Sequence, residues 1–256
     1  MIAKLKTLYW FASRPTFYWH GLELFLRKFK LNYDSPDYLI RATKWAKQNV
    51  VSVEKALEII GLIEEGIPIP KLDKELIAEA NLLAQKSKVQ MGGAGDIELI
   101  YAATHLSKAN FVIETGVAYG WSSLSILAAF NKSCSPLLVS IDMPYPKMDN
   151  EDYVGIVIPS FLKKYWHLIR KPDRKGIING IKMFDQSIDL CHYDSDKSYY
   201  GRSYGYPLLW NSLKEGGIFI SDDIQDNFAF KDFVESMNLV YAVTEYKGKY
   251  IGITRK

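Results

Sequence analysis

The chain has 256 residues, enough for one sizeable α/β domain with an appended segment. No apolar run approaches the roughly 18–20 residues that span a bilayer, and we expect neither a transmembrane segment nor a signal peptide. The net charge of +3 is uneven, because residues 1–33 carry six cations against a single acid, Glu23, which leaves −2 for the remainder. Since a nucleic-acid-binding fold needs a basic face on the fold itself, we expect no nucleic-acid partner.

The two cysteines, Cys134 and Cys191, show no motif spacing. Cys191 lies in a predicted core strand, so we expect it to be a buried thiol and not half of a disulfide. This pattern, together with the expected absence of a signal peptide, predicts a cytoplasmic location.

Residues 1–90 are predicted to form an N-terminal helical cap or extension. Ser35-Pro36-Asp37 is a helix start with proline in the first turn, and an apolar periodicity runs from Tyr38 to Leu62. Gly66-Ile-Pro-Ile-Pro interrupts it, and a second amphipathic helix is predicted from Leu72 to Lys86.

The first 33 residues mix cations with aromatic side chains such as Trp10, Phe17 and Trp19. One interpretation is a helix in peripheral contact with a membrane, basic on one side and aromatic on the other. The other is a cap that packs over an acceptor site or across a dimer interface, with its cations on the wet side. We favour the cap.

A glycine turn follows the first predicted strand. The apolar residues 111–113 end in Glu114, after which Gly116 and Gly120 precede a helix-like segment that starts at Ser122. Glycine lets a ligand lie against the backbone, and the helix start offers N–H groups to its polar part. The Gly-x-x-x-Gly spacing differs from the dinucleotide fingerprint Gly-x-Gly-x-x-Gly.

From residue 110 onward, strand patterns alternate with helices, as in a parallel sheet with crossover helices. Strands are predicted at 111–115, 137–142, 166–169, 188–194, 217–222, 238–244 and 249–254. The last two flank Lys247-Gly248-Lys249 and predict an antiparallel hairpin. Residues 91–256 are therefore expected to form an α/β domain, a Rossmann-like doubly wound sheet of seven strands that is mostly parallel.

Asp142 follows the second strand, where an acid in an open α/β sheet accepts hydrogen bonds from ribose hydroxyls. The excursion from Met143 to Tyr165 is longer than a simple connection requires, and a loop of this length beside a site is more often functional. Gly92, Gly93 and Gly95, ahead of a helix from Asp96 to Ser107, form a second glycine-rich loop that either approaches the ligand or is a plain turn.

Carboxylates gather at the ends of two later strands. Asp194 follows the fourth strand and Asp222 and Asp223 follow the fifth. Three carboxylates at adjacent strand ends repel one another unless something positive lies between them. This could be a divalent cation such as Mg²⁺, for which oxygen ligands are suited, or it could be Lys197 or Arg202.

In order and spacing, four segments resemble the small-molecule O-methyltransferases among the class I S-adenosylmethionine-dependent methyltransferases. The segments are Glu114-Thr-Gly-Val-Ala-Tyr-Gly-Trp-Ser, Ile141-Asp, Asp194-Ser-Asp-Lys-Ser-Tyr and Gly216-Gly-Ile-Phe-Ile-Ser-Asp-Asp. The bacterial branch with an Asp-x-Asp-[His/Lys]-Ser-Tyr signature is the most similar. The resemblance spans about residues 90–255 and implies S-adenosylmethionine as cofactor, held by Glu114, Gly116, Gly120, Ser122 and Asp142.

In metal-dependent catechol-type relatives, an Asp and an Asp-Asn pair hold Mg²⁺. The corresponding residues here are Asp194, Asp222 and Asp223, with Asp in place of Asn, and Asn227 could also supply an amide oxygen. The resemblance makes Lys197 the first candidate for the catalytic base. Without a metal, Lys197 would neutralise the carboxylates, and Asp194 or His192 would be the base. His192 itself reads as a structural core histidine.

The expected reaction is methyl transfer to a hydroxyl of a small molecule, such as a sugar or a secondary metabolite. Tyr199 and Arg202, just beyond the fourth strand, are candidates for contact with this acceptor. A nicotinamide-dependent oxidoreductase and a non-catalytic nucleotide-binding or assembly protein remain as alternatives. The sequence leaves the oligomeric state open, a homo-oligomer included.

Overall fold

The computed structural model describes residues 7, 9–146, 149–185 and 187–256. Lys4 and Lys6 of the predicted basic segment, and positions 147–148 of the predicted 143–165 excursion, lie outside the described residues. Within those residues, no helix is both long and apolar enough to cross a membrane.

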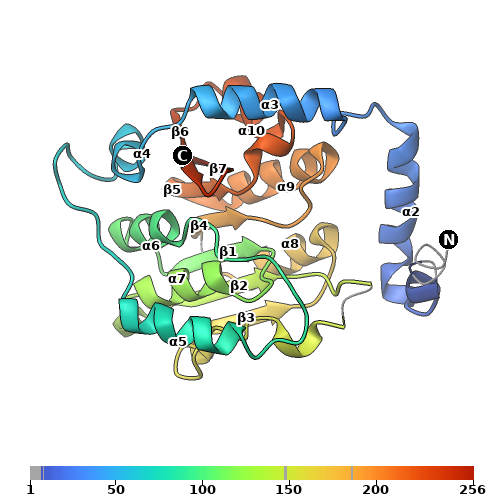
Figure 1. Cartoon of the computed structure of the whole chain (residues 1–256), viewed down its shortest axis with the longest axis horizontal. Coiled ribbons are helices and arrows are strands. Elements are labelled where there is room, and N and C mark those ends of the chain that lie inside the picture. Colours follow the sequence, from blue (N-terminus) through green and yellow to red (C-terminus); the bar gives the residue numbers. More distant parts are fainter. Residues whose placement is uncertain (1–6, 8, 147–148, 186) are drawn as a thin grey trace.

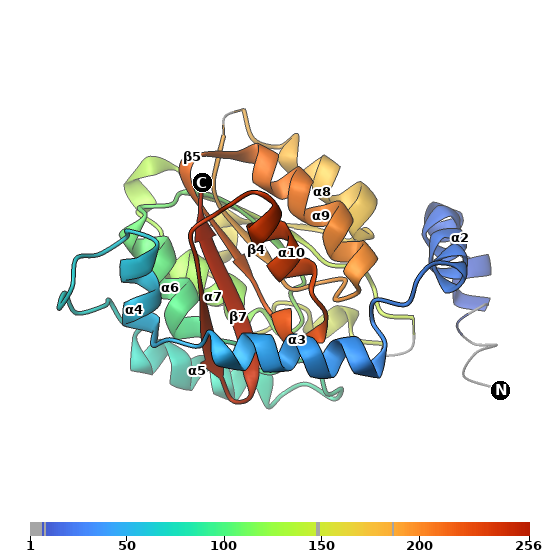
Figure 2. The same cartoon turned by 90° about the horizontal axis from the view of Figure 1, so that it is seen from above.

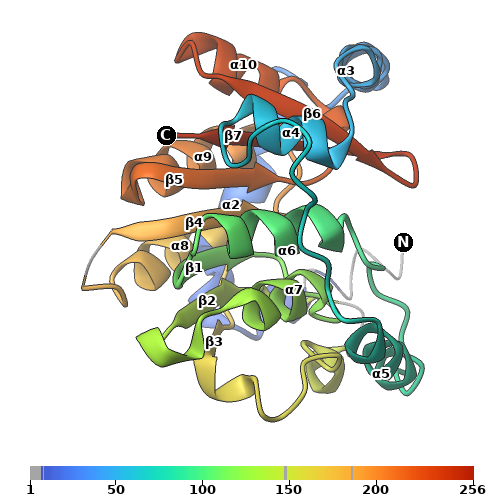
Figure 3. The ribbon, with the colours of Figure 1, turned by 90° about the vertical axis from the view of Figure 1, so that its left-hand side faces the viewer.

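A seven-stranded sheet organises the molecule, with strand order β3-β2-β1-β4-β5-β7-β6. The strands are β1 (Phe111–Thr115), β2 (Leu137–Ile141), β3 (Trp166–Ile169), β4 (Ile188–Tyr193), β5 (Leu213–Ser221), β6 (Tyr241–Tyr246) and β7 (Lys249–Arg255). The first five pair in parallel, whereas β7 is antiparallel to both β5 and β6. The predicted fold class is confirmed, including the C-terminal hairpin. Figure 3 shows the strands stacked in this order.

Helices cover both faces of the sheet (Figure 1). The helices of the described residues are α2 (Tyr18–Leu26), α3 (Pro36–Gln48), α4 (Val53–Ile59), α5 (Lys74–Ala84), α6 (Ile97–Leu106), α7 (Trp121–Ala129), α8 (Asp173–Ile181), α9 (Tyr199–Ser212) and α10 (Ala229–Ser236). Short 3-10 turns include η2 (Arg27–Phe29) and η6 (Ile224–Asp226).

Neighbouring residues of each central strand point into two different cores, as the period of two in a strand requires. In β1, Val112 packs with α4, α6 and α7, whereas Ile113 packs with α8 and α9. In β4, Leu190 lies in the same core as Val112, and Cys191 lies in the same core as Ile113. Burial on both faces explains why these strands appear in the sequence as short continuous apolar runs.

The single helix suggested by the periodicity from Tyr38 to Leu62 is in fact two helices, α3 and α4. The chain becomes extended between them, where Val50 forms a parallel bridge with Val243 of β6. Ser52 then caps α4 by accepting a hydrogen bond from the Lys55 amide. The bridge to β6 therefore ends the first helix, and the Ser52 N-cap starts the second, although the apolar periodicity continues across both.

Helix α2 lies beside the body of the molecule, at the right of Figure 1, whereas α3 runs along one edge of the sheet. In Figure 2, turned by 90°, α2 again stands to one side of the sheet. Polar contacts, described below, connect α2 to the carboxyl end of the parallel strands.

Candidate active site

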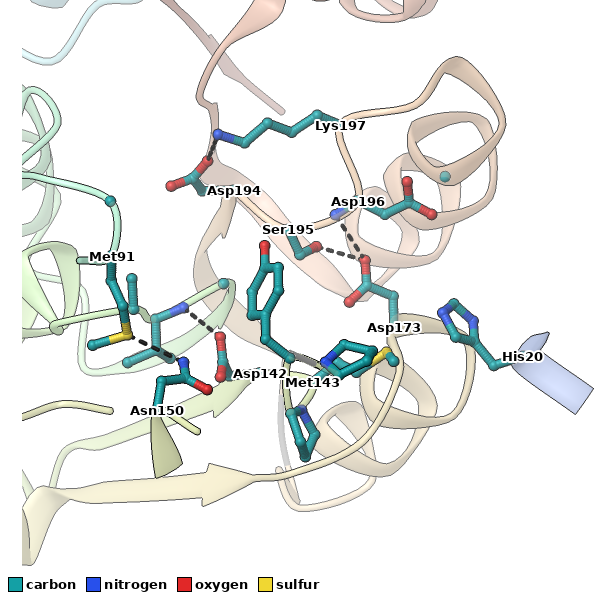
Figure 4. A pocket seen from close by; sticks show the side chains of 18 of the residues that line it. His20, Met91, Asp142, Met143, Asn150, Asp173, Asp194, Ser195, Asp196 and Lys197 are labelled. Atoms are coloured by element: carbon teal, nitrogen blue, oxygen red, sulfur yellow. Dashed lines mark hydrogen bonds and ion pairs between the residues drawn. The ribbon is translucent and has the colours of Figure 1, made fainter. Parts of the chain in front are cut away.

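A cavity of about 660 Å³ lies at the carboxyl ends of the parallel strands. Its volume is within the range of small-molecule sites, and its position is where ligands bind in open α/β sheets. It is lined by residues 90–92, by 116–118 after β1, by 142–146 and Asn150 after β2, by 173–174 of α8, by 194–197 after β4, by Gly201 and Tyr204 of α9, and by His20, Leu24 and Arg27. Figure 4 shows the side chains that meet in it.

The two turn glycines have different surroundings. Gly116 lines the cavity with φ +82°, and a Cβ there would collide with the Asp194 carbonyl oxygen. Gly120, with φ +92°, starts α7, and a Cβ there would lie 2.9 Å from the Gly155 Cα. Gly116 thus brings the backbone close to the cavity, while Gly120 lets the 143–165 segment pack against the turn.

Glu114 is buried and does not line the cavity. Its carboxylate accepts hydrogen bonds from Ser140 Oγ at 2.6 Å, from Ser122 Oγ at 3.0 Å and from Ser123 Oγ. The predicted binding residues Glu114 and Ser122 therefore contact each other, and the carboxylate fixes the start of α7 relative to β1 and β2. Ser122 also lines a side cavity of about 70 Å³ next to the main one.

Asp142 lines the cavity at the end of β2. Its Oδ1 accepts a hydrogen bond from the Val117 amide at 3.1 Å, and its Oδ2 forms an ion pair with Arg170. Burial raises the pKa of this carboxyl and outweighs the opposite effects of Arg170 and the amide. Asp142 is thus a hydrogen-bond acceptor at the predicted ribose position, with one oxygen already shared with a cation.

We use the name acidic cluster for Asp194, Asp222 and Asp223, which the structure brings together at the tips of β4 and β5. Lys197 Nζ lies 3.2 Å from Asp194 Oδ1 and also forms an ion pair with Asp223. Lys249 of β7 adds a second cation, with Nζ 3.2 Å from Asp223 Oδ1. Two lysines therefore neutralise much of the repulsion.

His192 supplies a third cation beneath the acidic cluster. It is fully buried, with Nδ1 3.7 Å from Glu114 Oε2 and Nε2 3.4 Å from Asp222 Oδ1. Burial alone lowers the pKa of the imidazole, but Asp222 and Glu114 outweigh it and raise this pKa to about 10. At neutral pH His192 is an imidazolium between two carboxylates, and it has no proton-accepting nitrogen.

The acidic cluster does not fit the predicted metal site. Among the described residues, no three His, Cys, Asp or Glu side chains are grouped to hold a metal ion. Each carboxylate of the cluster instead faces a protein cation, and the Asn227 amide oxygen accepts hydrogen bonds from Arg202 Nη1 and the Ala229 amide, both at 3.2 Å. No step is therefore assigned to a metal here.

The two predicted catalytic residues differ in their affinity for a proton. Burial, reinforced by Asp222, raises the pKa of Asp194 to about 6 although Lys197 opposes the shift. Burial lowers the pKa of Lys197, but Asp194 and Asp223 outweigh it, so the net shift is upward. At neutral pH Asp194 can therefore accept a proton, whereas Lys197 remains a cation.

Tyr199 and Arg202, the predicted acceptor contacts, lie on α9 and do not line the cavity. Arg202 is fully buried and donates to the carbonyl oxygens of Asp222 and Asp223 at 3.1 and 2.8 Å. The Tyr199 hydroxyl donates to Asp232 Oδ2 at 2.9 Å. Arg202 supports the acidic cluster from beneath.

Two sets of cavity residues escaped the sequence reasoning. Asp173 and Arg174 begin α8, and Asp173 Oδ2 accepts a hydrogen bond from Ser195 Oγ at 2.5 Å. Burial raises the pKa of Asp173 to about 6. The helix start in Pro172-Asp173, directly after the third strand, is the signal that could have identified this segment.

The other set comes from α2 and η2. Arg27 Nη1 pairs with Asp196 Oδ2 at 2.7 Å and donates to Ser198 Oγ at 2.8 Å. Glu23 Oε2 lies 2.5 Å from Arg174 Nε. Half-buried ion pairs therefore hold this helix against the cavity, over a sequence separation that local patterns do not reveal.

The chain is similar to a known protein family and to several solved structures. A family model described as a methyltransferase domain matches residues 113–224, and no curated protein sequence matches the chain. Similar solved structures are an O-methyltransferase from Bacillus cereus in complex with SAH (10% identity, TM-score 0.58, covering 82% of this chain and 100% of that one) and a methyltransferase from Geobacter sulfurreducens (13%, 0.55, 80% and 99%). A third is the O-methyltransferase TomG from Streptomyces achromogenes in complex with SAM (12%, 0.52, 81% and 100%).

At these identities the structural similarity establishes the fold, while the family match covers the segment that holds the glycine turn, Asp142 and the acidic cluster. The family match favours a methyltransferase over the nicotinamide-dependent alternative. Residues 113–224 thus match a methyltransferase domain, and the chain has the fold of solved methyltransferases.

Proposed function

We propose that the chain is an S-adenosylmethionine-dependent O-methyltransferase that acts on a hydroxyl group of a small molecule, such as a sugar or a secondary metabolite. The observation that carries the proposal is the cavity itself: it is lined by Asp142 at the end of β2 and by Asp194 at the end of β4, both within the segment that matches the methyltransferase domain.

The residues that line the cavity fit S-adenosylmethionine. Asp142 is an acceptor for ribose hydroxyls, and Gly116 lines the cavity at a position where a Cβ would collide with the Asp194 carbonyl oxygen and displace the backbone beside the cofactor. Asp194 offers negative charge to a sulfonium. When bound, S-adenosylmethionine supplies a methyl group on a positively charged sulfur, so the protein needs chiefly to orient the acceptor and remove its proton.

Asp194 is the proposed proton acceptor. With a pKa of about 6 it is mostly ionised at neutral pH and yet remains a usable base. Lys197 holds it in place and lowers the energy of its charged form. The sequence alone favoured Lys197 as the base, but its raised pKa supports the role of an electrostatic partner.

Residues 1–90 are proposed to act as a cap, because His20, Leu24 and Arg27 contribute to the cavity. A cytoplasmic location is proposed from the two cysteines, since both Cys134, which is exposed, and Cys191, which is buried, are free.

The test is a calorimetric titration of the full-length protein with S-adenosylmethionine. Loss of a hydrogen bond to a charged group weakens binding about 10- to 100-fold, which is the effect expected for Asp142→Ala. Asp37→Ala is the matched control, because the Asp37 side chain is 76% exposed and does not line the cavity.

The second arm uses an acceptor identified by screening for transfer of a labelled methyl group. Asp194→Asn should bind the cofactor more weakly, because it loses the charge that faces the sulfonium, and at saturating cofactor it should lose turnover by about 10²–10⁴-fold. Absence of cofactor binding by the wild-type protein would overturn the proposal.

A further inference from the structure

The N-terminal helix, defined here as Tyr18–Phe29 (α2 with η2), turns its charged side toward the protein and its apolar side outward. The side chains of His20, Glu23 and Arg27 are only 16%, 18% and 13% exposed. The opposite side consists of large apolar residues, Tyr18, Trp19, Leu22, Phe25, Leu26 and Phe29, whose exposure ranges from 46% to 77%.

This orientation is fixed by polar contacts. Arg27 pairs with Asp196, and Glu23 pairs with both Arg27 and Arg174. Rotating the helix to bury its apolar side would break these ion pairs, so the exposed side is a stable feature of the fold. A contiguous apolar surface of six large side chains marks an interaction site.

The charges around this surface favour an anionic partner over a second copy of the chain. Lys28 is exposed within the helix, Arg14 is exposed ahead of it, and Glu23, the sole acid among residues 1–33, faces inward. Lys30, also exposed, has its Nζ 4.7 Å from the centre of the Tyr200 ring. In a twofold dimer formed through this side, the cations of both copies would be brought together, at an electrostatic cost. A bilayer with anionic lipids matches the apolar side and the cations at once.

We propose that the N-terminal helix is a membrane-docking surface that lies in the interface of an anionic bilayer. Its apolar side enters the boundary between headgroups and acyl chains, and Arg14 and Lys28 contact the headgroups. Because the inward side lines the cavity through His20 and Arg27, docking brings the cavity next to the lipid. Figures 1 and 2 show this helix beside the body of the molecule, where a flat surface can approach it.

The experiment is co-sedimentation of the full-length protein with vesicles of phosphatidylcholine alone or with one third phosphatidylglycerol. The wild-type protein should sediment with the anionic vesicles and much less with the neutral ones. Phe25→Ser should weaken this binding at least about tenfold, the effect of removing one buried aromatic side chain. Lys28→Glu should weaken it about 30-fold on anionic vesicles and little on neutral ones.

Phe161→Ser is the matched control, because Phe161 is 56% exposed and Phe25 is 54% exposed. It should bind anionic vesicles within about twofold of wild type. Unchanged affinity for S-adenosylmethionine in all variants would show that they are folded.

Light scattering of the protein without vesicles tests the alternative partner. A dimer that Phe25→Ser dissociates, together with no sedimentation on anionic vesicles, would overturn the proposal and assign the surface to a second copy of the chain. Equal vesicle binding by Phe25→Ser and Phe161→Ser would also overturn it.

Discussion

Replacing Lys197 by Met separates two roles for this residue, a base and an electrostatic partner of Asp194. Lys197 Nζ lies 3.2 Å from Asp194 Oδ1, and a cation at this range lowers a carboxyl pKa by about 1–3. Because the Lys197 side chain is 39% exposed, solvent screening favours the lower end of that range. The pKa of Asp194, about 6 in the wild type, should therefore rise in Lys197→Met.

The Lys197→Met substitution should therefore shift the acidic limb of the pH–rate profile. With a pKa of about 6, Asp194 is roughly nine-tenths ionised at pH 7, and activity should rise with pH through about 6. In Lys197→Met the limb should move to about pH 7–9. At pH 7 the variant should be roughly 2- to 90-fold slower than wild type, and it should recover at higher pH.

The assay is kcat/KM for methyl transfer measured from pH 5 to 10 for wild type, Lys197→Met and Lys197→Arg. Arginine keeps the charge but cannot act as a base at these pH values, so Lys197→Arg should retain an acidic limb near the wild-type one. If both variants lose activity equally at every pH, Lys197 is the base and the reasoning is refuted. If all three limbs coincide, the titrating group is not Asp194.

Three further predictions concern the turn, the buried histidine and metal dependence. Gly116→Ala should lose cofactor affinity at least about tenfold by calorimetry, whereas Gly66→Ala, which has the same φ of +82° but no atom within 4 Å of the added Cβ, should bind normally. His192→Gln leaves Glu114 and Asp222 without their shared cation and should cost about 3–5 kcal/mol in urea unfolding. Since the raised pKa of about 10 stabilises the fold fully below the unfolded value near 6.5, the wild-type advantage over His192→Gln should fall as pH rises from about 6.5 to 10. Turnover in EDTA should stay within about twofold of turnover in Mg²⁺, and a larger loss would contradict the cation pairing of the acidic cluster.

The sheet was predictable because its strands are short apolar runs between turn residues. The predictions at 111–115 and 166–169 agree with β1 and β3. Both faces of the central strand β1 meet helices, whereas β3 is an edge strand that is buried only in part. Local capping was harder to anticipate. Ser198 caps α9 by accepting a hydrogen bond from the Gly201 amide, so the helix begins at Tyr199 and turns Arg202 into the interior.

The site was predictable where the topology alone determines position. Gly116, Asp142 and Asp194 each follow a parallel strand, and parallel strands end at one edge of the sheet, so all three reach the cavity. The sequence does not reveal in which direction a side chain points. Glu114 precedes the turn by two residues but faces the serines of α7 and β2, and Arg27 reaches Asp196 across 169 residues of sequence.

The charges around the acidic cluster suggest how the site distinguishes a cationic ligand. Glu114 and the three carboxylates of the cluster contribute four negative charges, and His192, Lys197, Lys249 and the buried Arg202 contribute four positive ones, so the charges balance. Within this set, Asp194 is the carboxylate that lines the main cavity, in a setting where burial strengthens electrostatic interactions. A sulfonium beside Asp194 is attracted by its charge, whereas the thioether left after methyl transfer is not. We therefore expect Asp194 to favour binding of the methyl donor over binding of its product.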